Sequence, residues 1–166
     1  FNQITGDFFA TSGEIRLFGE DVTRLRPHER AHKGLSRTYQ IITLFTKDTL
    51  VHNVTLGLLG LTPHRWNMFR PLSHYHNMEH EARHVLATVG LSAMADRLVS
   101  EIAYGQKRRV EIAMAMAQKP RLLLLDEPLA GLSSEERTTI KELIAAIPRE
   151  TTVVMIEHDM DTALDL

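Results

Sequence analysis

Hydrophobic positions along the chain form three short runs that predict buried strands. The clearest is the run of four leucines at 122–125, which is too short for a membrane span and is typical of a central strand covered on both faces. A run rich in β-branched residues at 151–156 predicts a second strand. Residues 35–40 form a third strand-like run, after a short helix that we expect to begin near Pro27 and to end before Gly34.

Apolar residues at helical spacing predict three longer helices. Residues 77–89 place their apolar side chains on one stripe, and Gly90 is suited to end that helix. A second helix is predicted over 106–118, stopped by Pro120. The third follows Ser133, whose spacing to Glu136 is that of a capping box.

Two adjacent carboxylates, Asp126 and Glu127, follow the leucine run directly. The strand, helix and strand between 121 and 156 predict a right-handed crossover in a parallel sheet, which makes the fold class α/β. Ligands in open α/β sheets bind at the carboxyl ends of the strands, where these two residues and His158 are expected to lie. Poorly solvated carboxylates are costly unless they hold a metal or handle protons. The plainer alternative is a strand that ends in a polar turn.

Composition narrows the class of protein. The 166 residues are 43% apolar and 24% charged, as in one ordinary globular domain. The net charge of -2 provides no basic field for nucleic acid, so no nucleic-acid partner is expected. The chain has no cysteine, which excludes disulfides and thiol chemistry. We find no apolar stretch of membrane-spanning length and no secretory signal at the start.

The polar motifs, taken in order, resemble those of the ATP-binding cassette (ABC) ATPase family. Gln40 is similar to its Q-loop glutamine, and residues 102–106 resemble its signature motif. Asp126 and Glu127 resemble the Walker B pair, residues 130–133 the D-loop, and His158 the switch histidine. The resemblance implies a P-loop NTPase (RecA-like) core with a parallel sheet and an inserted α-helical subdomain. It assigns 1–40 and 120–166 to the core and 41–119 to the helical signature subdomain.

This resemblance implies binding and hydrolysis of ATP with Mg²⁺. Glu127 would orient or deprotonate the attacking water, and His158 would contact the γ-phosphate. Asp126 would hold Mg²⁺, with the amide oxygen of Gln40 as a further ligand.

A second set of residues is implied to serve the ATP of an opposite subunit. Ala103, Tyr104, Gly105 and Gln106 precede the helix predicted over 106–118, so backbone amides there can bind a phosphate. Ala103 lacks the hydroxyl of the common signature motif, and Ser133 stands where many relatives have Asp in the D-loop.

Within the family, the chain resembles the ATP-binding subunits of branched-chain amino acid importers. This similarity lies in residues 5–7, 11–15, 36–40, 103–105 and 124–132. It implies a second ABC ATPase subunit and transmembrane permease subunits as partners, and a peripheral position on the cytoplasmic face of the inner or plasma membrane. The alternatives are a lipid or lipopolysaccharide exporter ATPase, a non-transport ABC ATPase, and a catalytically inactive fragment. The transported solute cannot be read from the sequence.

Three histidines, His76, His80 and His84, lie four residues apart and would share one face of a helix. That spacing can bind Zn²⁺, but no cysteine or buried carboxylate completes a site. We interpret them as part of a solvated polar face.

The pattern Gly-x-x-x-x-Gly-Lys-Ser/Thr, whose amides and lysine hold nucleotide phosphates, occurs nowhere in the chain. The resemblance implies that this loop lies before residue 1. It also implies that 159–166 begin a helix that continues further, so the chain is expected to be truncated at both ends.

The missing phosphate-binding loop generates a prediction. A polypeptide limited to residues 1–166 should bind ATP more weakly than micromolar, because it lacks the loop whose amides and lysine hold the triphosphate. Isothermal titration with Mg-ATP measures this, and micromolar affinity would contradict it.

Overall fold

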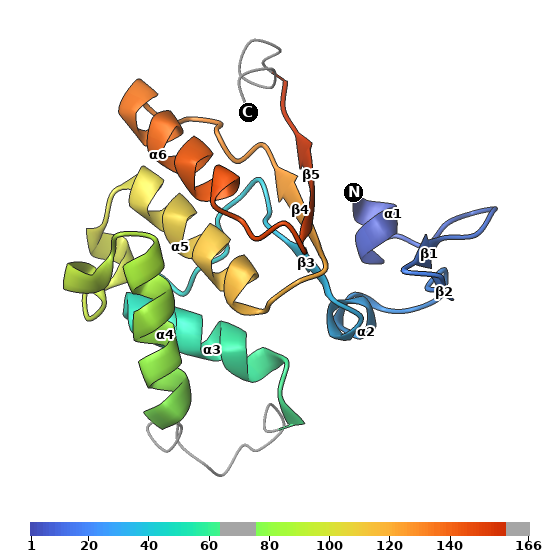
Figure 1. Cartoon of the computed structure of the whole chain (residues 1–166), viewed down its shortest axis with the longest axis horizontal. Coiled ribbons are helices and arrows are strands. Elements are labelled where there is room, and N and C mark those ends of the chain that lie inside the picture. Colours follow the sequence, from blue (N-terminus) through green and yellow to red (C-terminus); the bar gives the residue numbers. More distant parts are fainter. Residues whose placement is uncertain (64–75, 159–166) are drawn as a thin grey trace.

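The computed structural model describes residues 1–63 and 76–158 as a parallel sheet with helices packed beside it (Figure 1). The described helices are α1 (Asn2–Thr5), α2 (Pro27–His32), α3 (Leu50–Gly60), α4 (His76–Thr88), α5 (Tyr104–Ala117) and α6 (Ser134–Ala145), with short 3-10 turns at Ser92–Met94 and Val99–Glu101. The described strands are β1 (Arg16–Leu17), β2 (Glu20–Asp21), β3 (Leu35–Arg37), β4 (Leu122–Asp126) and β5 (Thr152–Ile156).

The main sheet has the order β3-β4-β5, and all its strands are parallel. The predicted central strand is confirmed, because Leu123, Leu124 and Leu125 are 0% exposed. Helix α6 connects β4 to β5, as the strand-helix-strand order predicted. In the register of that pair Asp126 lies opposite Ile156, so the two strands end at the same edge. The expected α/β class is therefore confirmed.

β3 and α5 differ in their bounds from the prediction. The strand predicted over 35–40 ends at Arg37, and only one more hydrogen bond, from Thr38 N–H to Leu124 O (2.9 Å), continues the ladder. Glu20 and Asp21 form the short strand β2, which pairs antiparallel with β1. Helix α5 begins at Tyr104, two residues before its predicted start, because Ala103 already has the extended backbone of an N-cap.

Helices α3, α4 and α5 pack on one another beside the sheet, as Figure 1 shows. The predicted apolar stripe is confirmed at Ala82 and Leu86 of α4 and at Val89 directly after it, all of which are buried. These residues join Leu50 and Val110 in one hydrophobic cluster, while a separate cluster lies under the sheet around Leu35 and Leu124. The division at residues 40 and 120 remains a prediction. The helix expected to begin at 159 lies outside the described residues.

Helix α6 has the predicted capping box. The hydroxyl of Ser133 accepts a hydrogen bond from Glu136 N–H (3.3 Å), and the Glu136 carboxylate accepts one from Ser133 N–H (2.9 Å). Both bonds satisfy backbone groups that the helix itself leaves without partners.

The cap generates a stability prediction with a matched control. Ser133→Ala removes the capping acceptor and should lower the free energy of unfolding by about 1 kcal/mol. Ser134→Ala, the next and exposed residue, removes no capping acceptor and should change it by less than about 0.5 kcal/mol. Urea denaturation of both variants measures the difference, and equal effects would mean that the cap contributes nothing.

Candidate functional site

The side chains of Gln40, Glu127 and His158 meet at the carboxyl end of the sheet. Glu127 Oε1 lies 2.7 Å from His158 Nε2, and Glu127 Oε2 accepts a hydrogen bond from Gln40 Nε2 (3.1 Å). The three residues come from segments far apart in the sequence. The structure therefore brings together three of the predicted site residues, because Gln40 and His158 both contact the Glu127 carboxylate.

The backbone after β4 directs Glu127 to this position. Glu127 N–H donates to Ile156 O (2.9 Å), which joins the ends of the two neighbouring strands. Its φ of 46° lies in the left-handed region, which residues other than glycine adopt uncommonly and which is frequent at functional sites. The Glu127 side chain is 15% exposed, whereas that of His158 is 80% exposed. The carboxylate is thus shielded, and the imidazole reaches it from the surface.

Asp126 takes part in a different contact. Its Oδ2 lies 2.7 Å from Nη2 of Arg37, which also contacts Asp7 Oδ2 (3.1 Å) and Asn2 Oδ1 (2.7 Å) through Nη1. The two predicted metal ligands therefore have different partners: Gln40 is bonded to Glu127, and Asp126 is bonded to Arg37.

Sequence reasoning missed Arg37 as a member of the site. The signal was present, because Arg37 is a basic residue in a strand-like run and the acidic pair follows another strand. Only the parallel pairing of Arg37 with Leu124, two residues before Asp126, makes the two charges neighbours.

A second group of predicted residues lies where α5 and α6 begin. Residues 104–106 were expected to precede a helix, and they form its first turn instead. Ala103 is the N-cap and has no side-chain acceptor, but its N–H donates to Gln106 Oε1 (2.9 Å). Tyr104 is 45% exposed, so its ring remains on the surface.

Glu136 connects this group to the D-loop residue Ser133, and sequence reasoning saw it only as a capping residue. A Cβ added to Gly105 would lie 2.2 Å from Glu136 Oε1, so a side chain at this position would displace the Glu136 carboxylate from its present place. Hydrogen bonds from Ser133, and then from Gly105 N–H, lower the pKa of the Glu136 carboxyl. The carboxylate therefore stays charged at the start of both helices, where helix dipoles favour negative charge.

The donor chemistry at the sheet edge fits Mg²⁺. The carboxylate of Asp126 and the amide of Gln40 provide oxygen atoms, the ligands that this hard cation prefers. Within residues 1–63 and 76–158, no three His, Cys, Asp or Glu side chains form a group that could hold a metal ion on their own. A metal at this edge would therefore need oxygen atoms from a nucleotide or water as well.

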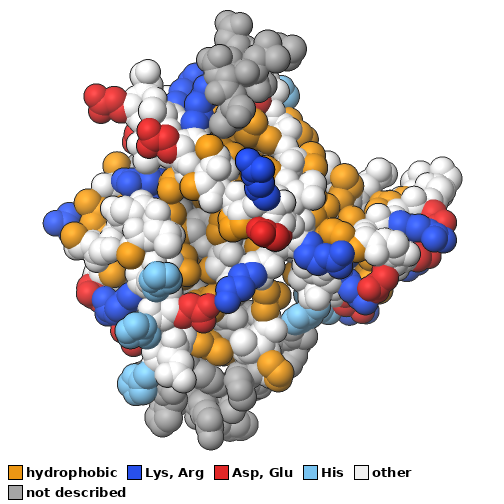
Figure 2. All heavy atoms as spheres, viewed as in Figure 1, with side chains coloured by type: hydrophobic (Ala, Val, Ile, Leu, Met, Phe, Trp, Pro, Cys, Tyr) orange, Lys and Arg blue, Asp and Glu red, His pale blue; other side chains and the backbone are white. Residues whose placement is uncertain are grey.

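The three histidines of α4 do not add such a site. His76, His80 and His84 are exposed, and Figure 2 shows histidine side chains gathered on the surface in the region of this helix. The same view shows acidic and basic side chains interspersed over the molecule.

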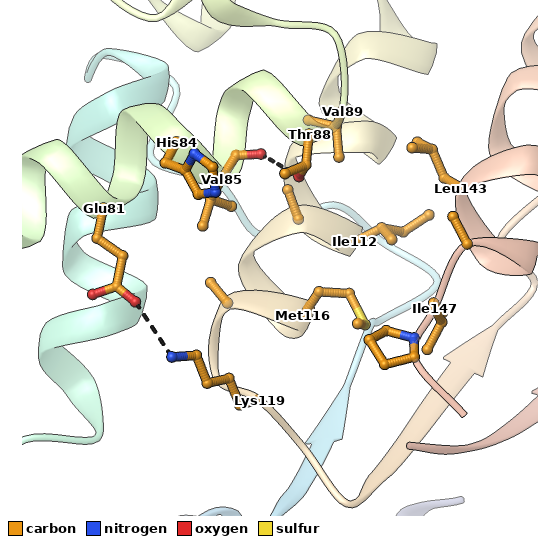
Figure 3. Close-up of a pocket in the computed structure, with 14 residues that line it drawn as sticks. Glu81, His84, Val85, Thr88, Val89, Ile112, Met116, Lys119, Leu143 and Ile147 are labelled. Carbon is orange, nitrogen blue, oxygen red and sulfur yellow. Dashed lines mark hydrogen bonds and ion pairs between the residues drawn. The ribbon is translucent and has the colours of Figure 1, made fainter. Parts of the chain in front are cut away.

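A groove of about 550 Å³ lies between α4, α5 and α6. It is not lined by any of the residues predicted to bind nucleotide or metal. Figure 3 shows Val85, Ile112 and Met116 facing Leu143 and Ile147 across it. At its margin Glu81 Oε1 and Lys119 Nζ are 4.0 Å apart. The walls of the groove are mostly apolar.

None of the helices in the described ranges has both the length and the apolar character needed to span a membrane.

Comparison with known proteins gives consistent results. A family model described as "ABC transporter" matches residues 1–130. The high-affinity branched-chain amino acid transport ATP-binding protein BraF of Pseudomonas aeruginosa is 41% identical over 179 residues, covering 100% of this chain and 68% of the relative. The corresponding protein LivG of Escherichia coli K12 is 34% identical over 173 residues, with the same coverage.

Solved structures of ATP-binding cassettes have the same fold. A nucleotide-free cassette superposes with a TM-score of 0.83 at 27% identity, and one in its ADP conformation with a TM-score of 0.83 at 28% identity. Each alignment covers 99% of this chain and 66% of the solved chain, so this chain spans about two thirds of its relatives. The expected P-loop NTPase fold is confirmed. With the parallel sheet, the ordered motifs and the family model in agreement, we conclude that the chain belongs to the ABC transporter family.

Proposed function

We propose that this protein is the ATP-hydrolysing subunit of an ABC transporter that imports a small solute, such as a branched-chain amino acid. The observation that carries the proposal is the Glu127 carboxylate, which contacts both Gln40 and His158 at the carboxyl end of a parallel sheet. A shielded carboxylate between an amide and an imidazole is suited to position a water and accept its proton.

Each residue at this edge has a proposed task. Glu127 orients and deprotonates the attacking water, and Gln40 restrains both the carboxylate and that water. His158 contacts the terminal phosphate through its imidazole, which is exposed enough to meet a ligand. These tasks supply positioning and charge stabilisation, which make up most of the catalysis of phosphoryl transfer.

Asp126 and Gln40 are the proposed ligands of Mg²⁺. The ion would neutralise charge on the phosphates when bound. Arg37 now holds one oxygen of Asp126, and it fixes the direction of that carboxylate while competing for it as a cation.

Ala103, Tyr104, Gly105, Gln106 and Ser133 are proposed to face the nucleotide of a second ABC ATPase subunit. Backbone amides in the first turn of α5 are suited to bind a phosphate, which would take the place of the Glu136 carboxylate at Gly105 N–H. Because each ATP would then need residues from two subunits, we infer that hydrolysis requires a dimer.

The remaining partners and the location follow from the relatives. BraF and LivG are named as branched-chain amino acid transport proteins, and PotA 1 of Pseudomonas aeruginosa, 33% identical, is named for spermidine and putrescine import. The higher identity to BraF favours amino acids. We propose that transmembrane permease subunits hold the protein at the cytoplasmic face of the inner or plasma membrane.

A substitution at Glu127 tests the catalytic assignment. In the full-length protein, Glu127→Gln should lower ATP turnover about 10²- to 10⁴-fold, because the amide cannot accept the proton of the water. ATP binding should persist, since the side chain keeps its size and hydrogen-bonding capacity. Phosphate release and nucleotide binding are measured separately.

The matched control is Glu150→Gln, which makes the same change at an exposed position before β5 and should leave turnover unchanged. Turnover retained by Glu127→Gln would reject Glu127 as the base. A parent protein that binds ATP without hydrolysing it would reject the enzymatic function and favour a role in interaction alone.

A further inference from the structure

The segment that carries Gln40 has no regular secondary structure. β3 ends at Arg37, and the next helix begins at Leu50. The position of Gln40 therefore depends on individual contacts made by this loop.

A fully buried arginine of α5 binds the start of the loop. Arg108 is 0% exposed, and its guanidinium donates from Nη1 to Tyr39 O (2.8 Å) and from Nη2 to Gln40 O (3.2 Å). Its Nε is buried and has no hydrogen-bond partner within the described residues. The guanidinium thus holds two consecutive backbone carbonyls of the loop through its terminal nitrogens.

Glu111, one helical turn further along α5, completes the contact. Its Oε2 lies 2.9 Å from Arg108 Nη1, and its Oε1 accepts a hydrogen bond from Thr43 N–H (3.3 Å). Burial raises the pKa of the Glu111 carboxyl, and Arg108 opposes that rise. The pair has no net charge, and each partner compensates part of the desolvation free energy of the other. It can therefore hydrogen-bond a buried polar backbone.

The contacts on either side show which part of the molecule holds the loop. Thr38 N–H bonds to Leu124 O and so belongs to the sheet. The backbone carbonyls of Tyr39 and Gln40 bond instead to a side chain of α5. After the Arg108 contacts, Phe45 N–H bonds to Asn53 Oδ1 of α3 (2.8 Å), and Asn53 Nδ2 bonds back to Phe45 O (3.1 Å). The boundary between the sheet-bound and helix-bound chain falls between Thr38 and Tyr39.

We propose that Arg108 and Glu111 are positioning residues that bind residues 39–43 to α5, so that Gln40 follows this helix rather than the sheet that carries Glu127. The first turn of α5 contains Tyr104, Gly105 and Gln106, so any displacement of that turn changes the contact between Gln40 and Glu127. The loop attachment stands on the contacts above, and its effect on turnover rests on the proposed function.

The decisive variant is the double substitution Arg108→Met/Glu111→Met in the full-length protein. It removes both charges together and leaves no unpaired buried charge, so the fold is expected to survive, whereas either single substitution to Met risks unfolding. The carbonyls of Tyr39 and Gln40 and the N–H of Thr43 then lose their partners. Hydrogen exchange of residues 39–45, measured without nucleotide, should become about tenfold faster or more, with exchange in β4 unchanged.

The matched control is Arg109→Met, a change of the next arginine on the same helix. Arg109 donates to Val89 O (3.2 Å), after the end of α4, and makes none of the loop contacts described above. Exchange in 39–45 should remain as in the parent. Unchanged exchange in the double variant, or equal acceleration by Arg109→Met, would overturn the proposal.

Turnover supplies a second measurement. The double variant should lower kcat about tenfold or more while the KM for ATP stays within about twofold, because misplacing Gln40 disturbs the reacting geometry rather than nucleotide binding. Arg108→Lys keeps the cation but not the planar fork, so its kcat should lie between parent and double variant. Equal kcat in all of them would reject the effect on turnover. Exchange without nucleotide tests the attachment even if Glu127→Gln disproves the proposed function.

Discussion

The parallel pairing of β3, β4 and β5 is the constraint on which the rest of this molecule depends. Three fully buried leucines hold β4 in the centre, and the register with β5 brings Asp126 beside Ile156. Because side chains at the ends of parallel strands share one edge, the polar residues that follow each strand are gathered there. A slip of one residue would turn Asp126 to the other face and separate it from Arg37.

Two arginines bind groups at the points where strands of this sheet end and loops begin. Arg37 joins the end of β3 to Asp126 at the end of β4, and Arg108 joins the loop after β3 to α5. Each presents a planar group with several donors, so one side chain can satisfy partners from different segments. Arg37 thereby orients a candidate metal ligand, while Arg108 holds the backbone of the residue that contacts Glu127.

Glu127 and Gly105 mark two different ways in which a functional position restricts the residue that occupies it. Glu127 accepts an uncommon backbone conformation, which directs its carboxylate toward Gln40 and His158. At Gly105 a side chain would displace the Glu136 carboxylate that lies against it. The first restriction concerns backbone strain, and the second concerns space. In each case a carboxylate lies beside a group proposed to contact phosphate: Glu127 beside His158, and Glu136 beside Gly105.

The sequence by itself determined the features that depend on local chemistry. The leucine run predicted β4, the spacing of Ser133 and Glu136 predicted the cap of α6, and the order of motifs predicted the family. It overestimated the length of β3, because residues 39 and 40 continue a strand-like run but their backbone carbonyls bond to Arg108 of α5. Only the tertiary structure decided that Arg37 meets Asp126, 89 residues away, and that Arg108 meets Tyr39, 69 residues away. Such pairs depend on how separate elements pack, and local spacing carries no information about the distance between them.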